Sequence, residues 1–436
     1  MTEQALPARH RRTGGSRRPV LTLADQLVSS ASNFIVGVLI ARAGGADALG
    51  AFGIAFLIWL VVVGTNRALV TEPMTVGGSL DSENAELREG LLASLTLGVG
   101  GAGLVAVAGS VMGLAGLNPV STLALAPWIP SLLVQDYCRL MAFRLRRPDR
   151  ALISDVVFAV VQGTATLGLF VLHVGSVSAF LATWGIGATA GALVGLGQVH
   201  VRVTGRGGIA HLRALWPRSR WFLAEFGTAF LSNQGYLFLL PVLLGTAGFG
   251  VYRAGASFIG PVIVIFLVGG NVGLPECVRR LRQHGMPGLA AYTLRLTAAV
   301  VALTALYCGI AAILAVPMLR LTYGEKFTGA AVITQLVAVD YIISAVGFGF
   351  GVALKAAGQM RQLWALRAAS AIVSLTGIIV LTNSFGLTGA GLAAVVAGAA
   401  YTVGVAVAYR RLRLRPAVYF PAGGRHHRHN QAESDP

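Results

Sequence analysis

The sequence predicts an all-α polytopic membrane protein with about twelve transmembrane helices, arranged as two six-helix bundles. Three observations predict this fold: a hydrophobic composition, recurring apolar runs and an internal duplication. Hydrophobic residues make up 55% of the 436 residues and charged residues only 12%, whereas soluble domains carry roughly 25% charge. The mean hydropathy is +0.72. The net charge of +17 does not indicate nucleic-acid binding, because the apolar runs leave no room for a basic soluble face.

Apolar runs of about 20 residues, each long enough to cross a hydrocarbon core of about 30 Å as a helix, recur along almost the whole chain. We place the spans at 20–42, 49–71, 91–115, 122–143, 151–173, 177–198, 221–244, 248–274, 290–316, 328–354, 363–384 and 386–409. The predicted parts are a basic cytoplasmic tail (1–19), an N-terminal bundle (20–198), a basic cytoplasmic linker (199–220), a C-terminal bundle (221–412) and a second cytoplasmic tail (413–436).

The distribution of basic residues predicts the orientation. Nearly all of them fall in the two tails and in every second connection, and the remaining connections hold only Arg42, Arg320 and Lys326. Because loops rich in Arg and Lys stay in the cytoplasm, both termini are predicted to be cytoplasmic, which requires an even number of helices. We expect a multi-pass protein of the bacterial plasma membrane.

An internal repeat links the two halves. Leu23-Ala24-Asp25 and Ser32-Asn33 recur as Leu223-Ala224-Glu225 and Ser232-Asn233, an offset of 225 − 25 = 200 residues. Phe52-Gly53-Ile54 matches Phe249-Gly250-Val251 at an offset of 197, and Asp136-Tyr137 is echoed by Asp340-Tyr341. Since six is even, the two halves share one orientation. Transporters built from such parallel repeats bind their cargo between the halves and alternate access by rocking one against the other.

The repeated segment resembles the opening of polysaccharide and lipid-linked oligosaccharide flippases. The resemblance rests on Ala24-Asp25-Gln26, Ser32-Asn33, Ala41-Arg42, Gly50-Ala51-Phe52-Gly53 and, near the end, Phe385-Gly386-Leu387-Thr388-Gly389-Ala390-Gly391 with Tyr409-Arg410-Arg411. These flippases belong to the superfamily of multidrug, oligosaccharidyl-lipid and polysaccharide exporters. The resemblance covers residues 20 to 412 and implies a transporter that moves a lipid-linked glycan to the outer leaflet by alternating access. Glycosyltransferases or a polymerase are the implied protein partners.

Two alternatives stay open. The first is a cation-coupled multidrug exporter of the same superfamily, although Asp25 lies nearer the cytoplasmic helix end than an ion-binding acid in that span would. The second is an integral-membrane glycan-processing enzyme, which the short external loops disfavour. Neither a catalytic residue nor a cofactor or metal site is predicted, and coupling to H⁺ or Na⁺ is left open. The sequence Gly98-Val99-Gly100-Gly101-Ala102-Gly103 matches a nucleotide-binding pattern but lies inside a predicted helix without a preceding strand.

Polar residues inside the spans are the candidate transport residues, because a charge at mid-bilayer costs at least about 2.5–3.5 kcal/mol unless it faces protein or water. They are Asp25, Asn33, Arg42, Arg67, Asp136, Arg139, Glu225, Asn233, Arg253 and Asp340. Asp340, near the middle of its span, is predicted to contact cargo or carry a proton, with structural pairing to an arginine as the alternative. Asp136 and Arg139, three residues apart, have the competing interpretation of a mutually neutral pair on one helix face. The arginines are candidates to bind the phosphate of a lipid-linked sugar, because a guanidinium group binds phosphate in a bidentate manner.

Overall fold

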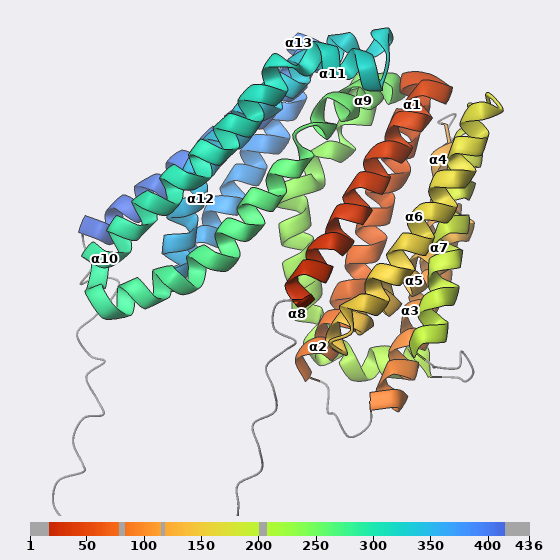
Figure 1. Ribbon diagram of the computed structural model, residues 1–436, viewed down its shortest axis with the longest axis horizontal. Helices are drawn as coiled ribbons and strands as arrows, with labels where there is room; N and C mark the ends of the chain where they lie inside the picture. The colour runs from red at the N-terminus through yellow and green to blue at the C-terminus, as the bar shows by residue number, and fades with distance from the viewer. Residues whose placement is uncertain (1–16, 78–82, 115–117, 200–206, 415–436) are drawn as a thin grey trace, which may run out of the picture. The chain divides into compact units, whose positions relative to one another are not determined.

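The computed structural model describes residues 17–77, 83–114, 118–199 and 207–414, which are almost entirely helical and contain no strand (Figure 1). The longer helices are α1 (Arg17–Asn66), α3 (Glu83–Leu114), α5 (Ile129–Arg144), α6 (Pro148–Val171), α7 (Val177–Val199), α8 (Gly208–Gln234), α9 (Leu240–Ser257), α10 (Ile263–Ile313), α12 (Ala331–Ala356) and α13 (Met360–Leu414). The shorter ones are η1 (Arg67–Thr71), α2 (Glu72–Gly77), α4 (Val120–Leu125), η3 (Ala126–Trp128), η4 (Gly235–Phe238), η5 (Gly260–Val262), α11 (Ala315–Thr322) and η6 (Glu325–Ala330).

Seven helical stretches in these ranges are long and apolar enough to cross a membrane, so the fold is that of a multi-pass membrane protein. Three of them, of 46, 54 and 55 residues, are more than twice the ~20 residues that one crossing needs. Each contains a glycine with positive φ: Gly45 at 72°, Gly285 at 61° and Gly386 at 58°. At these glycines the chain leaves helical geometry, and each stretch has two limbs. The count of twelve crossings and the orientation stay predictions.

The chain divides into two compact units, which are described separately below. Unit 1 comprises the residues up to Phe230 together with Gly245–Val251, and unit 2 comprises Leu231–Leu244 and the residues from Tyr252 onward. The bundle boundaries predicted at 198 and 221 are not tested by this division and stay predictions.

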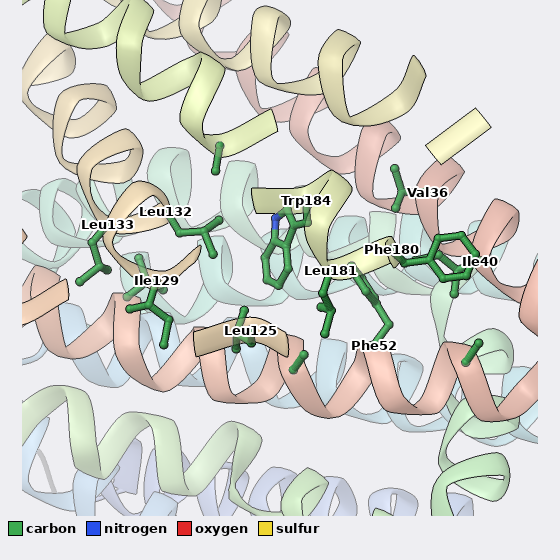
Figure 2. Packing of buried hydrophobic residues seen from close by; sticks show 14 residues of the cluster. Val36, Ile40, Phe52, Leu125, Ile129, Leu132, Leu133, Phe180, Leu181 and Trp184 are labelled. Carbon is green, nitrogen blue, oxygen red and sulfur yellow. The ribbon is translucent and has the colours of Figure 1, made fainter. Parts of the chain in front are cut away.

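The core of unit 1 is aromatic at its centre (Figure 2). Trp184 is 4% exposed. Its ring centroid lies 5.4 Å from that of Phe52, 6.1 Å from that of Phe56 and 6.0 Å from that of Trp59. A tryptophan near the end of a predicted span suggests an anchor at the membrane surface, but here the indole is packed inside the protein.

Helix α6 has its polar side inside. Four of its six buried residues are polar, and the full set is Pro148, Ala151, Ser154, Asp155, Gln162 and Thr166. The exposed side carries Ile153, Val156, Val160, Leu167 and Val171. Polar contacts join the buried side to α7: Ser154 Oγ donates to the Gly191 carbonyl at 3.0 Å, and the hydroxyls of Thr166 and Thr183 lie 2.9 Å apart. This polarity is the reverse of a water-soluble helix and suits a helix that faces lipid.

In unit 2, small residues let α12 lie close to two neighbours. A Cβ at Gly349 would lie 2.0 Å from Thr297 Oγ1 of α10, and a Cβ at Gly347 would lie 2.7 Å from Thr402 Oγ1 of α13. Small residues at such contacts are typical of helix packing in membranes, where close backbone approach replaces the hydrophobic effect.

A symmetric helix crossing within unit 1 is made of glycine. Gly45 and Gly245, 200 residues apart, adopt nearly the same conformation, with φ 72°, ψ −164° and φ 71°, ψ 174°. Five residues beyond each, a Cβ at Gly50 would lie 1.9 Å from the Thr246 carbonyl oxygen, and a Cβ at Gly250 would lie 2.0 Å from that of Ala46. The offset is therefore 200 here too.

The pairing of Phe52-Gly53-Ile54 with Phe249-Gly250-Val251 at an offset of 197 is accordingly wrong. Gly50 is the counterpart of Gly250, because the two glycines occupy reciprocal positions at one crossing. The two tripeptides are similar but not equivalent, and their offset of 197 is three residues shorter than the offset of 200 between Gly50 and Gly250.

Helices α5 and α12 end with the same hydrogen bonds. Helix α5 ends with Arg146 N–H donating to the Phe143 carbonyl at 3.0 Å and Arg147 N–H to that of Ala142 at 2.8 Å. Helix α12 ends identically, with Gly358 donating to Lys355 at 3.0 Å and Gln359 to Leu354 at 2.9 Å, and both central residues have positive φ.

Aligning these two ends gives an offset of 358 − 146 = 212 residues. Asp136 then lies 146 − 136 = 10 residues before its helix end, and Asp340 lies 358 − 340 = 18 residues before its own. The difference of eight residues is about 12 Å of helix. The same hydrogen bonds and a positive φ also end α6 at His173, so this type of helix end does not fix the alignment, and the echo of Asp136-Tyr137 in Asp340-Tyr341 stays a prediction.

Candidate functional site

The best-defined ionic contact of unit 1 joins Arg67 to Asp136. Arg67 opens η1, a π-helical turn that directly continues α1; such turns occur frequently at functional sites. Its Nε donates to Asp136 Oδ2 at 3.0 Å and its second nitrogen to Oδ1 at 2.5 Å. The Asp136 side chain is 5% exposed and that of Arg67 is 38% exposed. The carboxylate is therefore held inside by a bidentate guanidinium that reaches outward.

A second ionic contact lies one turn along α5. Arg139 Nε is 2.9 Å from Asp155 Oδ2 of α6, and Gln135 Nε2 donates to Asp155 Oδ1 at 2.8 Å. The carboxylate of Asp155 is 6% exposed. Asp136 and Arg139 are thus paired with other helical segments, which differs from the expectation of one neutral pair on α5.

Asp155 and Gln135 are absent from the candidates drawn from the sequence. Asp155 lies near the start of its predicted span, where an acid has an ordinary structural explanation. The spacing of Asp155, Gln162 and Thr166 at seven and four residues on one helix face is the signal that would have singled it out.

Glu72 lies between Arg67 and a second acid. Glu72 of α2 interacts electrostatically with both Arg67 and Glu225 of α8. Glu225 is exposed. The neighbouring Phe226 packs where a Cβ at Gly64 would lie, 2.0 Å from Phe226 Cε2. The structure thus brings together three of the predicted residues, Arg67, Asp136 and Glu225, at one end of unit 1.

Asp340 in unit 2 has different surroundings. It lies near the middle of α12, is half-buried and is hydrogen-bonded to Ser344. Its other electrostatic neighbours are the hydroxyls of Tyr236, Tyr252 and Tyr341. Tyr236 and Tyr252 are also hydrogen-bonded to each other. Among the residues that the structure describes, no arginine, lysine or histidine forms an ion pair with Asp340.

A glycine makes room for this carboxyl group. A Cβ at Gly398 of α13 would lie 1.9 Å from Asp340 Oδ1 and 3.3 Å from Ser344 Oγ. Tyr236 comes from η4, Tyr252 from α9 and Tyr341 from α12, so the cluster joins three segments, and Gly398 of α13 packs against it. We call Asp340, Ser344, Tyr236, Tyr252 and Tyr341 the Asp340 cluster.

Arg253 follows Tyr252 on α9, about 100° further around the helix. It interacts with Tyr323, the residue that directly follows α11, and the Tyr323 hydroxyl lies 3.0 Å from Ser257 Oγ. The two unit 2 candidates therefore belong to different surroundings: Asp340 to the cluster, and Arg253 to the contact between α9 and α11.

The remaining candidates are not gathered into either group. Asn33 and Arg42 of α1 are exposed. The side chains of Asp25 and Asn233 lie outside the part of the chain that the structure describes. No group of three or more His, Cys, Asp or Glu residues suited to a metal ion occurs in the described ranges. Cys138, Cys277 and Cys308 are buried and free.

The fold and the distribution of polar groups define a class: a helical multi-pass membrane protein with charged and hydroxyl groups inside its bundles. The sequence matches no protein-family model and no curated protein. Solved structures are similar to it in fold.

An inward-facing structure of a multidrug resistance MATE family transporter of the MOP superfamily superposes with a TM-score of 0.69 at 14% identity, covering 93% of this chain and 100% of that chain. The lipid II flippase MurJ, in an inward closed conformation, gives a TM-score of 0.69 at 14% identity and 92% coverage of both chains. An outward-facing structure of a multidrug resistance MATE family transporter of the MOP superfamily gives a TM-score of 0.57 at 14% identity, covering 93% of this chain and 95% of that chain. The chain therefore has the fold of these transporters and flippases.

Proposed function

We propose that this protein is a flippase that moves a lipid-linked oligosaccharide or polysaccharide repeat unit across the bacterial plasma membrane by alternating access. The fold is shared with transporters and with a lipid flippase, which favours transport over glycan processing by an enzyme. The likeness to polysaccharide flippases at residues 20–54 and 385–411 favours a glycan as the cargo. Glycosyltransferases or a polymerase would supply or consume the lipid-linked unit.

The observation that carries this proposal is the Asp340 cluster. In unit 1 the buried acids Asp136 and Asp155 are each held by an arginine. Asp340 is instead surrounded by hydroxyl groups. A carboxylate among tyrosines presents hydrogen-bond acceptors and donors together with aromatic faces, which suits a sugar. The same carboxylate offers a place for a coupling H⁺ or Na⁺.

A cation-coupled multidrug exporter is the second candidate, and the same cluster supports it. An organic cation would be attracted by the carboxylate and by the faces of tyrosine rings, and MATE transporters are among the similar structures. The two candidates differ in the charge of the cargo. A lipid-linked glycan carries an anionic phosphate that requires arginines, whereas a cationic drug requires only the acid and the aromatic rings.

A binding experiment separates the two functions. The full chain, reconstituted in lipid nanodiscs, would be titrated with a polyprenyl-pyrophosphate-linked oligosaccharide and, separately, with ethidium as a cationic dye, using native mass spectrometry for the first and fluorescence polarisation for the second. We expect saturable binding of the glycan lipid and none of ethidium. The reverse result would replace the flippase proposal by the drug-exporter one, and binding of neither would contradict both.

Asp340→Asn and Arg253→Ala are each expected to abolish export of the polymer while leaving the protein level in the membrane unchanged. Asn keeps the size of the side chain and removes the charge, so packing against Gly398 is preserved. Surface glycan and protein level would be measured in a deletion strain carrying each variant.

Two variants with matched chemistry serve as controls for these substitutions. Asp149→Asn removes an acid that is 47% exposed, and Arg320→Ala removes an arginine that is 59% exposed; both should export normally. Full export by Asp340→Asn and Arg253→Ala would show that neither residue belongs to the transport site.

A further inference from the structure

The first half of α8 carries a strip of alternating apolar and basic residues that the proposed transport function does not use. Ile209, Arg213, Trp216 and Arg220 are spaced by four, three and four residues, so they lie within about 60° on one face of the helix. Ile209 is 58% exposed and Trp216 is 52% exposed, and both arginines are exposed. We call these four residues the α8 strip.

Residues of α8 outside the strip are tied to the rest of unit 1. His211 Nδ1 lies 3.0 Å from Glu89 Oε2 of α3, and Ser219 Oγ donates to the Leu69 carbonyl of η1 at 2.8 Å. At the start of the helix, a Cβ at Gly208 would lie 2.6 Å from the Leu92 carbonyl oxygen. These contacts are spread over the 12 residues from Gly208 to Ser219, so they fix the rotation of α8 about its axis. The outward direction of the strip follows from this attachment.

The arginines of the strip are not neutralised by the protein. No acid of the described residues forms an ion pair with Arg213 or Arg220, and residues 199–224 contain no Asp or Glu. The guanidinium carbon of Arg220 lies 5.2 Å from the ring centroid of Trp221, which is an aromatic contact and leaves the charge without an acid. Trp221 is 68% exposed.

We propose that the α8 strip docks onto anionic phospholipid, with Arg213 and Arg220 on the headgroup phosphates and Ile209 and Trp216 between the upper acyl chains. Charge complementarity selects this occupant, because two unpaired arginines match phosphodiesters and exposed tryptophan prefers the membrane interface. A neutral lipid satisfies the tryptophan but leaves the arginines without an anionic partner. The lipid would thereby hold the first half of α8 against the membrane surface.

Each basic residue near an anionic membrane contributes about 1 kcal/mol, roughly fivefold. The two arginines together therefore give a preference of up to about 30-fold for an anionic over a zwitterionic lipid. The contribution is electrostatic and decreases with salt, since the screening length is about 10 Å at 0.1 M and about 3 Å at 1 M.

The test uses the full chain in nanodiscs of phosphatidylglycerol and phosphatidylcholine mixed 1:1, in which only one of the two lipids carries brominated acyl chains. Bromine quenches the fluorescence of nearby tryptophan. Quenching is measured in the unmodified protein and in Trp216→Phe/Trp221→Phe, and the part of the quenching that this variant lacks reports the lipid beside the strip. In the unmodified protein, brominated phosphatidylglycerol should quench this signal more strongly than brominated phosphatidylcholine. The difference should disappear in Arg213→Gln/Arg220→Gln and decrease in 1 M salt.

A matched control removes the same charge elsewhere. Arg410→Gln/Arg411→Gln eliminates two exposed arginines at the end of α13 and should leave the lipid preference beside the strip unchanged. Equal quenching by the two lipids in the unmodified protein would overturn the proposal, and this measurement needs no variant of the arginines. A preference that survives Arg213→Gln/Arg220→Gln, or that Arg410→Gln/Arg411→Gln removes equally, would also overturn it.

Discussion

Gly50→Ala is expected to destabilise unit 1, although alanine is the better helix former. The added methyl group would lie 1.9 Å from the Thr246 carbonyl oxygen and 2.8 Å from its carbon. Both are backbone atoms that cannot rotate away, so the two helices must separate. Overpacking of this kind costs about 1–3 kcal/mol. Thermal unfolding of the purified protein in detergent, followed by loss of monodispersity, measures the effect.

Gly100→Ala is the matched control, because it places the same substitution inside α3 where no atom lies within 4 Å of the new Cβ. It should be neutral or stabilising, since glycine costs roughly 0.8–1.0 kcal/mol relative to alanine in a helix. Gly250→Ala should resemble Gly50→Ala. The double variant should cost less than the sum, because helices already separated by one methyl group accommodate the other. Equal melting temperatures of Gly50→Ala and Gly100→Ala would contradict the close approach of the two helices at Gly50.

Arg67→Ala is expected to have the second large effect, because it leaves the Asp136 carboxylate buried without its partner. Breaking one side of a buried ion pair costs about 3–5 kcal/mol. The lower end applies here, since the Arg67 side chain is 38% exposed. The variant Arg67→Met/Asp136→Leu, which removes both charges, should melt closer to the unmodified protein than Arg67→Ala does. The same unfolding assay compares the two.

The exposed pair Arg147–Asp149 provides the control for this prediction. Its atoms lie 3.2 Å apart, and its side chains are 51% and 47% exposed. Arg147→Ala should therefore cost at most about 1 kcal/mol. A similar loss in Arg67→Ala and Arg147→Ala would mean that the Arg67–Asp136 contact does not stabilise the fold.

The membrane fold followed from composition, because hydropathy measures transfer of whole segments into lipid and needs no knowledge of neighbours. Predicting which charged side chains form pairs does require knowledge of the neighbouring helices. Asp136 and Arg139 fit one helix face in the sequence, but their partners Arg67 and Asp155 come from other helices, and spacing along one helix carries no information about those. Trp184 shows the same limit: its position near a span end suited the interface, whereas the neighbours that bury it, Phe52 and Trp59, come from α1.

The repeat was detectable where both copies retain similar residues, as at Ser32-Asn33 and Ser232-Asn233. It failed at Phe52-Gly53 and Phe249-Gly250, where similar residues suggested an offset of 197, whereas the reciprocal approach of Gly50 and Gly250 gives 200. The Asp340 cluster was predicted only through Asp340 itself, because Tyr252 and Tyr236 lie 340 − 252 = 88 and 340 − 236 = 104 positions earlier in the chain.

The arrangement of α6 has a consequence for protein engineering. The hydrogen-bonding side chains of α6 lie on the side that faces the protein. The apolar residues that make the helix insoluble in water lie on its outer side. Replacing Ile153, Val156, Val160 and Leu167 by glutamate, lysine or glutamine would change solvation while leaving Ser154, Asp155 and Thr166 with their present partners. For this helix, a water-soluble analogue would require a new exterior and could keep the native interior.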